Sequence, residues 1–340
     1  MGKRYLSTKI PKQKISYLNY NIFHQIYILF PLSVAGNISF FFLDRKINSR
    51  HTRRKILFGT KGGAHMATRR FDLYRYQIIP AQKQLNLLYN MDEVIQKKNL
   101  YFENALLETK NVNNRNKFTI EKRGNNSFTG TILRKKAVKL YMENGEEKYE
   151  TSYPPIHIII DNEPQWQIIA IERTPEYPKT TGLINKIAKS IDRILAKHNL
   201  IVKPSALSRN DKFWDYIENN KDDIQNISFT LITPNMSNIS AKLSEQIKQN
   251  AKKTKASETN FSIKAEKGAS LLIDRENELI GSMIEYISDG GGSASITARG
   301  VSAKFKTDDY QLSIAINELQ FKDLSTVLER IRRKVHGEKK

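Results

Sequence analysis

Hydrophobic and polar residues alternate along much of the first half of the chain, with the period of two that is typical of β-strands. The stretch 71–78 is the clearest example. The other strands expected in this half cover residues 129–141, 149–153, 156–160 and 166–173. The polar stretches at 111–116, 124–126 and 144–145 are expected to be turns. We therefore predict a curved antiparallel sheet or half-barrel in residues 71–173, with one helix at 91–108.

The pattern becomes helical near residue 180. Thr180-Thr181 can cap a helix whose apolar residues recur every three or four positions, as on one buried face. These residues are Leu183, Ile184, Ile187, Ile191, Ile194 and Leu195. A short strand at 200–202, which stops at Pro204, and a helix at 211–219 are expected next.

Strands and helices alternate in the last third of the chain. Strands are expected at 227–233, 260–265, 293–298 and 310–316, and helices at 237–251, 275–288 and 324–335. Alternation of this kind, with two strands following each other near the end, predicts a split-βαβ α/β sandwich with helices on one face of the sheet. The whole chain is thus expected to be α+β, with a β-rich domain at 66–204 and an α+β domain with a basic surface at 205–340.

Residues 1–65 differ from the rest in composition. Twelve of the 56 Lys and Arg residues lie there with a single acid, Asp44, so this segment carries +11 of the formal charge of +21. Gly62-Gly63 can be encoded as a ribosome-binding sequence, at a suitable spacing before an ATG codon at Met66. We therefore expect residues 1–65 to be an over-extended start that is not part of the fold.

Two other interpretations of this leader stay open. Residues 15–43 contain no charge, and the apolar residues within 26–43 approach the ~20 that a membrane-spanning helix needs. The leader would then be a membrane anchor, or alternatively an ordinary soluble extension. A secreted, oxidised protein finds no support because the chain contains no cysteine, and a cytoplasmic location is expected.

The residue types limit the possible chemistry. Without cysteine the chain has no disulfide, no thiol nucleophile and no thiolate metal site. The histidines after Met66 are His157, His198 and His336, and none has a His or carboxylate at the spacing of a zinc-binding helix. No metal or other cofactor is expected.

Clusters of cations in the last third are the candidate binding residues. They are Lys252, Lys253 and Lys255 at a helix end, Lys264 and Lys267 on the next strand, and Arg330, Arg332, Arg333 and Lys334 on the last helix. If the helices stack on one face of one sheet, these clusters could form a stripe that follows a phosphate backbone. Cations also favour helix C-termini without any ligand, so a solvated basic surface is the alternative.

The triple glycine in Ser288-Asp289-Gly290-Gly291-Gly292-Ser293 is a second candidate feature. Phosphate-binding loops lead from a strand into a helix N-terminus, where unpaired N–H groups point at the anion. Here the order is from helix to strand, so a flexible turn after a helix C-cap is the simpler interpretation.

Aromatic residues could stack on the bases of a single strand. Those that come into question are Trp166, Trp214, Tyr74, Tyr76 and Tyr141. Isolated aromatic residues at alternating strand positions belong more often to the core, and the core interpretation is favoured for this set.

Asp161 and Glu172 are the candidate metal ligands if the protein is a metal-dependent nuclease. An Asp followed about ten residues later by Glu-Xaa-Lys on the adjacent strand can hold a divalent ion. Here Glu172 is followed by Arg173-Thr174, so the lysine is missing. Asp161 also fits the hairpin turn it begins. The motifs of serine hydrolases, nucleotide-binding loops and kinases are absent from the sequence, and no active site is identified.

The order of elements after Phe229 resembles the DNA-binding C-terminal part of the RexA family, which belongs to prophage exclusion systems. The stretches 229–234, 261–265 and 292–296 carry the resemblance, together with the early strand at 71–78. It covers about the last 110 residues and contains no diagnostic motif. The resemblance implies a bacterial or phage protein that binds DNA without sequence preference and acts with a partner, and it assigns no individual residue.

The function expected from the sequence is a non-catalytic nucleic-acid-binding component of a bacterial antiphage defence system. Its expected partners are nucleic acid, most simply DNA bound without sequence preference, a second defence protein encoded nearby, and another copy of the chain. A membrane is a partner only if residues 26–43 form an anchor. The alternatives are a metal-dependent nuclease and an adaptor that recognises a phage protein through sheet edges.

Overall fold

The chain divides into two units, residues 1–63 and 64–340. The computed structural model describes residues 32–34, 37–39, 68–81, 91–112, 116–175, 177–233, 242–254, 256–317 and 323–337. In the first unit these form one antiparallel pair, β1 (Leu32–Val34) and β2 (Asn37–Ser39). The expectations for residues 1–65 otherwise lie outside the described residues. Among the residues that are described, no helix is long and apolar enough to cross a membrane.

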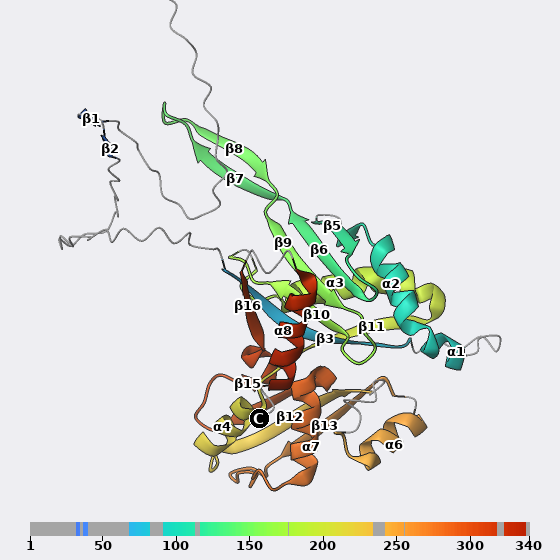
Figure 1. Cartoon of the computed structure of the whole chain (residues 1–340). Helices are drawn as coiled ribbons and strands as arrows, with labels where there is room; N and C mark the ends of the chain where they lie inside the picture. Colours follow the sequence, from blue (N-terminus) through green and yellow to red (C-terminus); the bar gives the residue numbers. More distant parts are fainter. Residues whose placement is uncertain are drawn as a thin grey trace, which may run out of the picture. The chain divides into compact units, whose positions relative to one another are not determined.

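An eight-stranded antiparallel sheet dominates the second unit. The strand order is β11-β3-β10-β9-β6-β5-β4, and β16 also pairs with β3. Its strands are β3 (Thr68–Pro80), β4 (Asn111–Val112), β5 (Asn116–Lys122), β6 (Ser127–Arg134), β9 (Pro155–Asp161), β10 (Ile168–Glu172), β11 (Leu200–Ala206) and β16 (Ser313–Asn317). Figure 1 shows how this large sheet curls. The predicted curved antiparallel sheet is confirmed.

Helices cover both faces of the large sheet. On one face lie α1 (Met91–Gln96), α2 (Lys98–Glu108), α3 (Thr181–Leu195) and the short η1 (Ala196–His198). The predicted stripe of α3 is buried there against Tyr74, Tyr76 and Ile78 of β3. Residues of β3 point alternately to opposite faces, so Phe71 and Leu73 meet α8 (Leu324–Gly337) on the other face.

A second sheet of four strands has the order β13-β12-β14-β15. Its strands are β12 (Ile224–Ile232), β13 (Glu258–Lys264), β14 (Gly292–Ala298) and β15 (Phe305–Lys306), and its helices are α4 (Asn210–Asn219), α6 (Glu245–Thr254) and α7 (Glu278–Tyr286). β12 is antiparallel to both neighbours, so β13 and β14 are parallel to each other and are joined through α7. This is the predicted split-βαβ unit.

Several boundaries differ from the sequence pattern. β5 begins at the last residue of the expected turn at 111–116, and its first residues alternate between buried and exposed. The expected helix at 91–108 is interrupted at Lys97. β11 continues through Pro204, where the missing N–H is tolerated because β11 lies at the edge of the sheet.

The end of the chain returns to the large sheet. β16 pairs with residues 68–72 of β3, and Val327, Leu328 and Ile331 of α8 pack against the same sheet. Residues 205–340 therefore contribute strands to both sheets. Local sequence patterns do not contain this pairing, because it joins strands almost 250 residues apart.

The triple glycine lies in a packed seam between the two sheets. It falls in the π-helical turn Ile287–Gly291, where Asp289, Gly290 and Gly291 are buried. Gly290 has a φ of 83°, and a Cβ there would overlap the side chain of Arg75 on β3. Tyr286 donates to the carbonyl of Ile232 at 2.6 Å. The expected flexible turn is thus a close contact that only glycine can form.

Candidate functional site

The predicted cations of the second sheet lie at two separate places. Lys253 is exposed at the end of α6, which leads into the first residue of β13, whereas Lys264 is the last residue of β13 and Lys267 follows it. Six residues of extended strand span about 20 Å, so one phosphate cannot bridge the two groups. Lys252 belongs to α6, but its side chain and Lys255 lie outside the described residues.

The predicted cations of α8 mainly attach this helix to the large sheet. Arg332 points inward and donates to both carboxylate oxygens of Asp161, at 2.7 and 3.0 Å. Arg330 donates to the carbonyl of Ala315 at 3.2 Å, and Arg333 pairs with Glu329 at 3.1 Å. Lys334 is on the same helix. These cations belong to a helix of the large sheet, whereas those of α6 and β13 belong to the smaller sheet.

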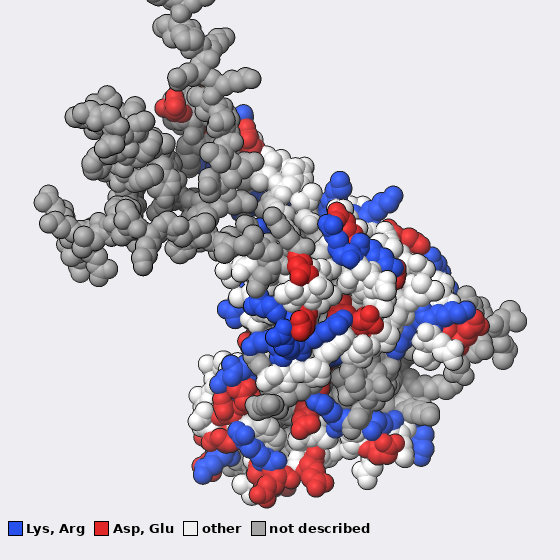
Figure 2. Space-filling view, in the orientation of Figure 1, with Lys and Arg blue, Asp and Glu red and all other residues white. Residues whose placement is uncertain are grey.

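Positive charge is concentrated in the β-rich part instead. Residues 66–204 contain 23 Lys and Arg against 15 acids, whereas residues 205–340 contain 21 against 19. Within the β-rich part, residues 110–136 contain eight cations and a single acid, Glu121. We call this segment the basic edge, because its strands β4, β5 and β6 form one edge region of the large sheet. In Figure 2 Lys and Arg gather over β5 and β6 and over α8, while both signs mix over the smaller sheet.

Three lysines of the basic edge lie close together. Lys117 of β5 pairs with Leu133 of β6, and Lys135 follows Leu133 by two residues. Phe118, the residue after Lys117, donates its N–H to the carbonyl of Lys110 at 2.9 Å. All three lysines are exposed, and none forms an ion pair with another described residue. Other cations of the segment are engaged, such as Lys122, which pairs with Glu103 at 2.5 Å. The three lysines are thus available to bind phosphate.

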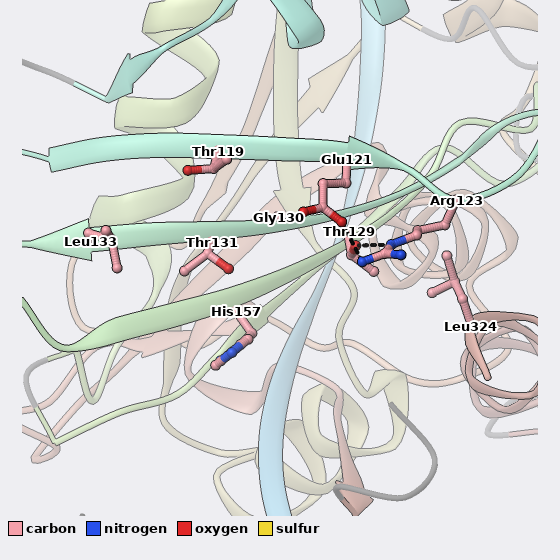
Figure 3. A pocket seen from close by; sticks show the side chains of 9 residues that line it. All are labelled: Thr119, Glu121, Arg123, Thr129, Gly130, Thr131, Leu133, His157 and Leu324. Carbon is pink, nitrogen blue, oxygen red and sulfur yellow. Dashed lines mark hydrogen bonds and ion pairs between the residues drawn. The ribbon is translucent and has the colours of Figure 1, made fainter. Parts of the chain in front are cut away.

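A groove of about 640 Å³ adjoins the basic edge on the face of the sheet that carries α8. Its lining residues are Thr119, Glu121, Arg123, Thr129, Gly130, Thr131, Leu133, His157 and Leu324. Thr119, Thr131 and His157 stand directly opposite one another on β5, β6 and β9, which gives a polar row across the sheet (Figure 3). Lys117 is on the groove face as well, because strand residues two apart point the same way.

His157 is held by a carboxylate and an arginine behind the row. Its Nδ1 lies 2.6 Å from Oε2 of Glu172, and its backbone N–H donates to the same oxygen at 3.0 Å. Arg69 donates to Oε1 of Glu172 at 3.0 Å. We call these residues the His157 cluster.

The carboxylate of the cluster is kept charged. Burial would raise the pKa of Glu172, but the two hydrogen bonds from His157 and the charge of Arg69 outweigh it, so the pKa is lowered. Nδ1 of His157 lies between this carboxylate, which only accepts hydrogen bonds, and Nη1 of Arg69, which only donates them and is 3.0 Å away. Glu172 and Arg69 together therefore hold the orientation of the imidazole.

The hypothesis of a metal site on Asp161 and Glu172 does not fit the geometry. Both residues face the same side of the β9–β10 pair, but Asp161 is opposite Ile168 and Glu172 lies beside His157, four residues away along the strand. This separation is about 13 Å, whereas ligands of one divalent ion lie within about 2.6 Å of it. Among the described residues no group of three or more His, Asp or Glu is placed to hold a metal ion.

The aromatic candidates are mostly core residues. Tyr74, Tyr76 and Trp214 are buried. Trp166 packs edge-on against His336 and lies under Arg332. Tyr141 is 67% exposed, at the end of β7 (Lys136–Tyr141), which forms a separate hairpin with β8 (Glu147–Ser152).

Neither the basic edge nor the role of His157 was expected from the sequence. A count of charge along the chain would have found the first, since residues 110–136 contain eight cations and one acid. The His157 cluster leaves no local signal, because its three members come from three strands. Comparisons with protein families, with curated proteins and with solved structures give no match for this chain.

Proposed function

We propose that this chain is a cytoplasmic nucleic-acid-binding protein that contacts phosphate through the basic edge and the adjoining groove. The observation that carries the proposal is the density of cations at 110–136, eight against one acid, beside a groove lined with threonine hydroxyls. Lysine neutralises phosphates and releases their counterions, and hydroxyls donate to phosphate oxygens without reading sequence. Binding is therefore expected to be strongly salt-dependent and independent of sequence.

The biological setting of this binding is a bacterial antiphage defence system. The resemblance of the elements after Phe229 to the RexA family supports this part of the proposal, together with a second defence protein as partner. Duplex DNA is the first ligand to test.

The binding proposal predicts a defined loss in a charge-neutral triple variant. In the full chain, Lys110, Lys117 and Lys135 are replaced by Gln, and the affinity for a fluorescent 20-base-pair duplex is measured by anisotropy at several NaCl concentrations. The slope of log affinity against log salt should become shallower by about 2–3, at about 0.9 for each lost phosphate contact. The free energy of unfolding should stay within about 0.5 kcal/mol, because all three side chains are at the surface.

The matched variant replaces Lys252, Lys253 and Lys255 by Gln. The proposed binding surface is the basic edge, so this second triple variant should leave the slope unchanged. A loss of slope in the second variant and none in the first would move the interface to the end of α6, as the sequence alone suggests. No binding by the wild-type chain at low salt would overturn the proposal.

One observation favours a second function, the adaptor. The β7–β8 hairpin is exposed along both strands and carries Leu140, Tyr141, Met142 and Tyr149 on its surface, which is unusual for residues without a partner. Its cations are largely neutralised, as in the pair of Lys139 and Glu147 at 2.5 Å, so it is better suited to protein than to phosphate. An adaptor predicts no salt-dependent duplex binding in the titration above.

A further inference from the structure

The His157 cluster contains a histidine in addition to a carboxylate–arginine ion pair. At the other end of the same strands, Asp161 and Arg332 form a two-point pair without any histidine. In the cluster, Glu172 and Arg69 form a comparable pair, and a histidine that lines the groove is added to it. A histidine oriented by a buried carboxylate is the arrangement that proteins use to accept a proton from a substrate hydroxyl.

Nucleic acid, the ligand proposed for the groove, has such a hydroxyl when it is RNA. RNA carries a 2′-hydroxyl next to each phosphodiester, and DNA does not. We propose, on the basis of the nucleic-acid-binding function above, that His157 is the general base of a metal-independent cleavage of single-stranded RNA in this groove. Glu172 is the positioning residue that holds the imidazole.

The reaction needs no group that the chain lacks. His157 accepts the proton of the 2′-hydroxyl, and the 2′ oxygen forms a bond to the adjacent phosphorus. The bond from phosphorus to the 5′ oxygen of the next nucleotide breaks, and that oxygen takes a proton from water. His157 then returns its proton to the solvent, which restores the water. The products are a 2′,3′-cyclic phosphate and a 5′-hydroxyl.

The surroundings of His157 suit the charge that develops on phosphorus. Thr131 is its direct neighbour across β6, and Thr119 is the next residue in the row, so two hydroxyl donors lie on the same face. Cross-strand neighbours have their Cβ atoms about 5 Å apart, so a phosphate can lie beside both Thr131 and His157. Arg123 lines the same groove, where it donates to Thr129 at 3.3 Å and forms an ion pair with Glu121. A single strand is required because the 2′ oxygen must line up with the leaving oxygen, and a duplex prevents this.

The test uses the full chain with a fluorescent single-stranded RNA of mixed sequence, in excess EDTA. Wild type should generate fragments that end in a 2′,3′-cyclic phosphate, and the same oligonucleotide with 2′-O-methyl groups should bind and stay intact. His157→Ala should reduce the cleavage rate at least ~100-fold with little change in RNA affinity, since general-base catalysis contributes 10²- to 10⁴-fold. Imidazole in the buffer should restore part of that activity, which no structural role of His157 explains. Glu172→Gln should lower the maximal rate more than the apparent affinity.

The matched control is His198→Gln, which removes a histidine that stacks on Tyr101 away from the groove and should leave the rate unchanged. Wild type that binds RNA without cleaving it would overturn the inference and leave the binding function intact. Cleavage that persists in His157→Ala, or that affects the 2′-O-methyl strand, would overturn it as well. Wild type that binds neither RNA nor DNA would overturn the proposed function itself.

Discussion

The β9–β10 pair carries a carboxylate–arginine pair at each end of one face, and the two ends differ in what covers them. Asp161 is 1% exposed and pairs with Arg332 of α8, whose guanidinium also lies over the ring of Trp166. The Glu172 end opens into the groove, and its arginine, Arg69, is accompanied by His157. Similar carboxylate–arginine pairs are therefore covered by a helix at one end of the two strands and adjoin an open groove at the other.

The closed end should depend on its pair for stability. Arg332→Met leaves the buried carboxylate of Asp161 without its bidentate partner, and breaking a buried pair in this way costs about 3 kcal/mol. Urea denaturation followed by circular dichroism measures the loss. Combining it with Asp161→Leu should restore most of the stability, because an apolar pair of similar size needs no desolvated charge.

Arg333→Met on the same helix is the control for this prediction. Its pair with Glu329 is exposed on both sides, with side chains 70% and 66% accessible, so the change should stay within about 0.5 kcal/mol. If Arg332→Met lowered the free energy of unfolding no more than Arg333→Met does, the Arg332–Asp161 pair would not be what stabilises the packing of α8 on the sheet.

The carboxylate–arginine pair at the groove, Glu172 and Arg69, should contribute less to stability than the pair under α8. Its contribution to the free energy of unfolding should depend on pH. Glu172→Gln removes a charged acceptor of several hydrogen bonds, which should cost about 1–2 kcal/mol at pH 7. The pKa of Glu172 is lowered in the folded chain from its ordinary value of 4.5, so its stabilisation is present above that pH and is lost as the pH falls through the folded pKa. The difference in unfolding free energy between wild type and variant should therefore narrow below about pH 4. A difference that stays constant from pH 7 to pH 3 would contradict a charged Glu172.

The smallest effect is expected from a single hydroxyl in the groove. Thr131→Val keeps the shape of the side chain on β6 and removes one hydrogen-bond donor beside His157. Affinity for nucleic acid should fall about 5-fold, which corresponds to one neutral hydrogen bond of about 1 kcal/mol. Stability should hardly change, since valine suits a strand at least as well as threonine does. Anisotropy at low salt measures the affinity, and an unchanged affinity would show that Thr131 does not contact the nucleic acid.

Much of the architecture follows from local patterns. The strand at 71–78, the apolar stripe from Leu183 to Leu195 and the helix at 324–335 were all predicted, and together they place most of the core. The α+β class and the split-βαβ unit follow from the order of these elements. The outer strand β5 was not predicted, although Phe118 and Ile120 face the core and alternate with polar residues along it.

The site could be predicted only in part. Asp161 and Glu172 were singled out as carboxylates on adjacent strands, and they do lie on β9 and β10, but their burial, their separation and their partners were not visible in the sequence. The cations chosen from runs near helix ends lie at separate places, and Arg332 among them is a packing residue. The cations of the basic edge were not predicted as binding residues, because they are spread over three strands and the segments between them.

The sequence by itself determined the period of each element, the buried face of each amphipathic helix and the total charge, because these depend on residues close together in the chain. The tertiary structure decided that β16 pairs with β3, that Gly290 packs on Arg75, and that His157 meets Glu172 and Arg69 in a groove. These contacts join residues far apart in sequence, so no local period records them. Whether a charged residue lies under a helix or in an open groove is settled by what packs above it, and that depends on the whole fold.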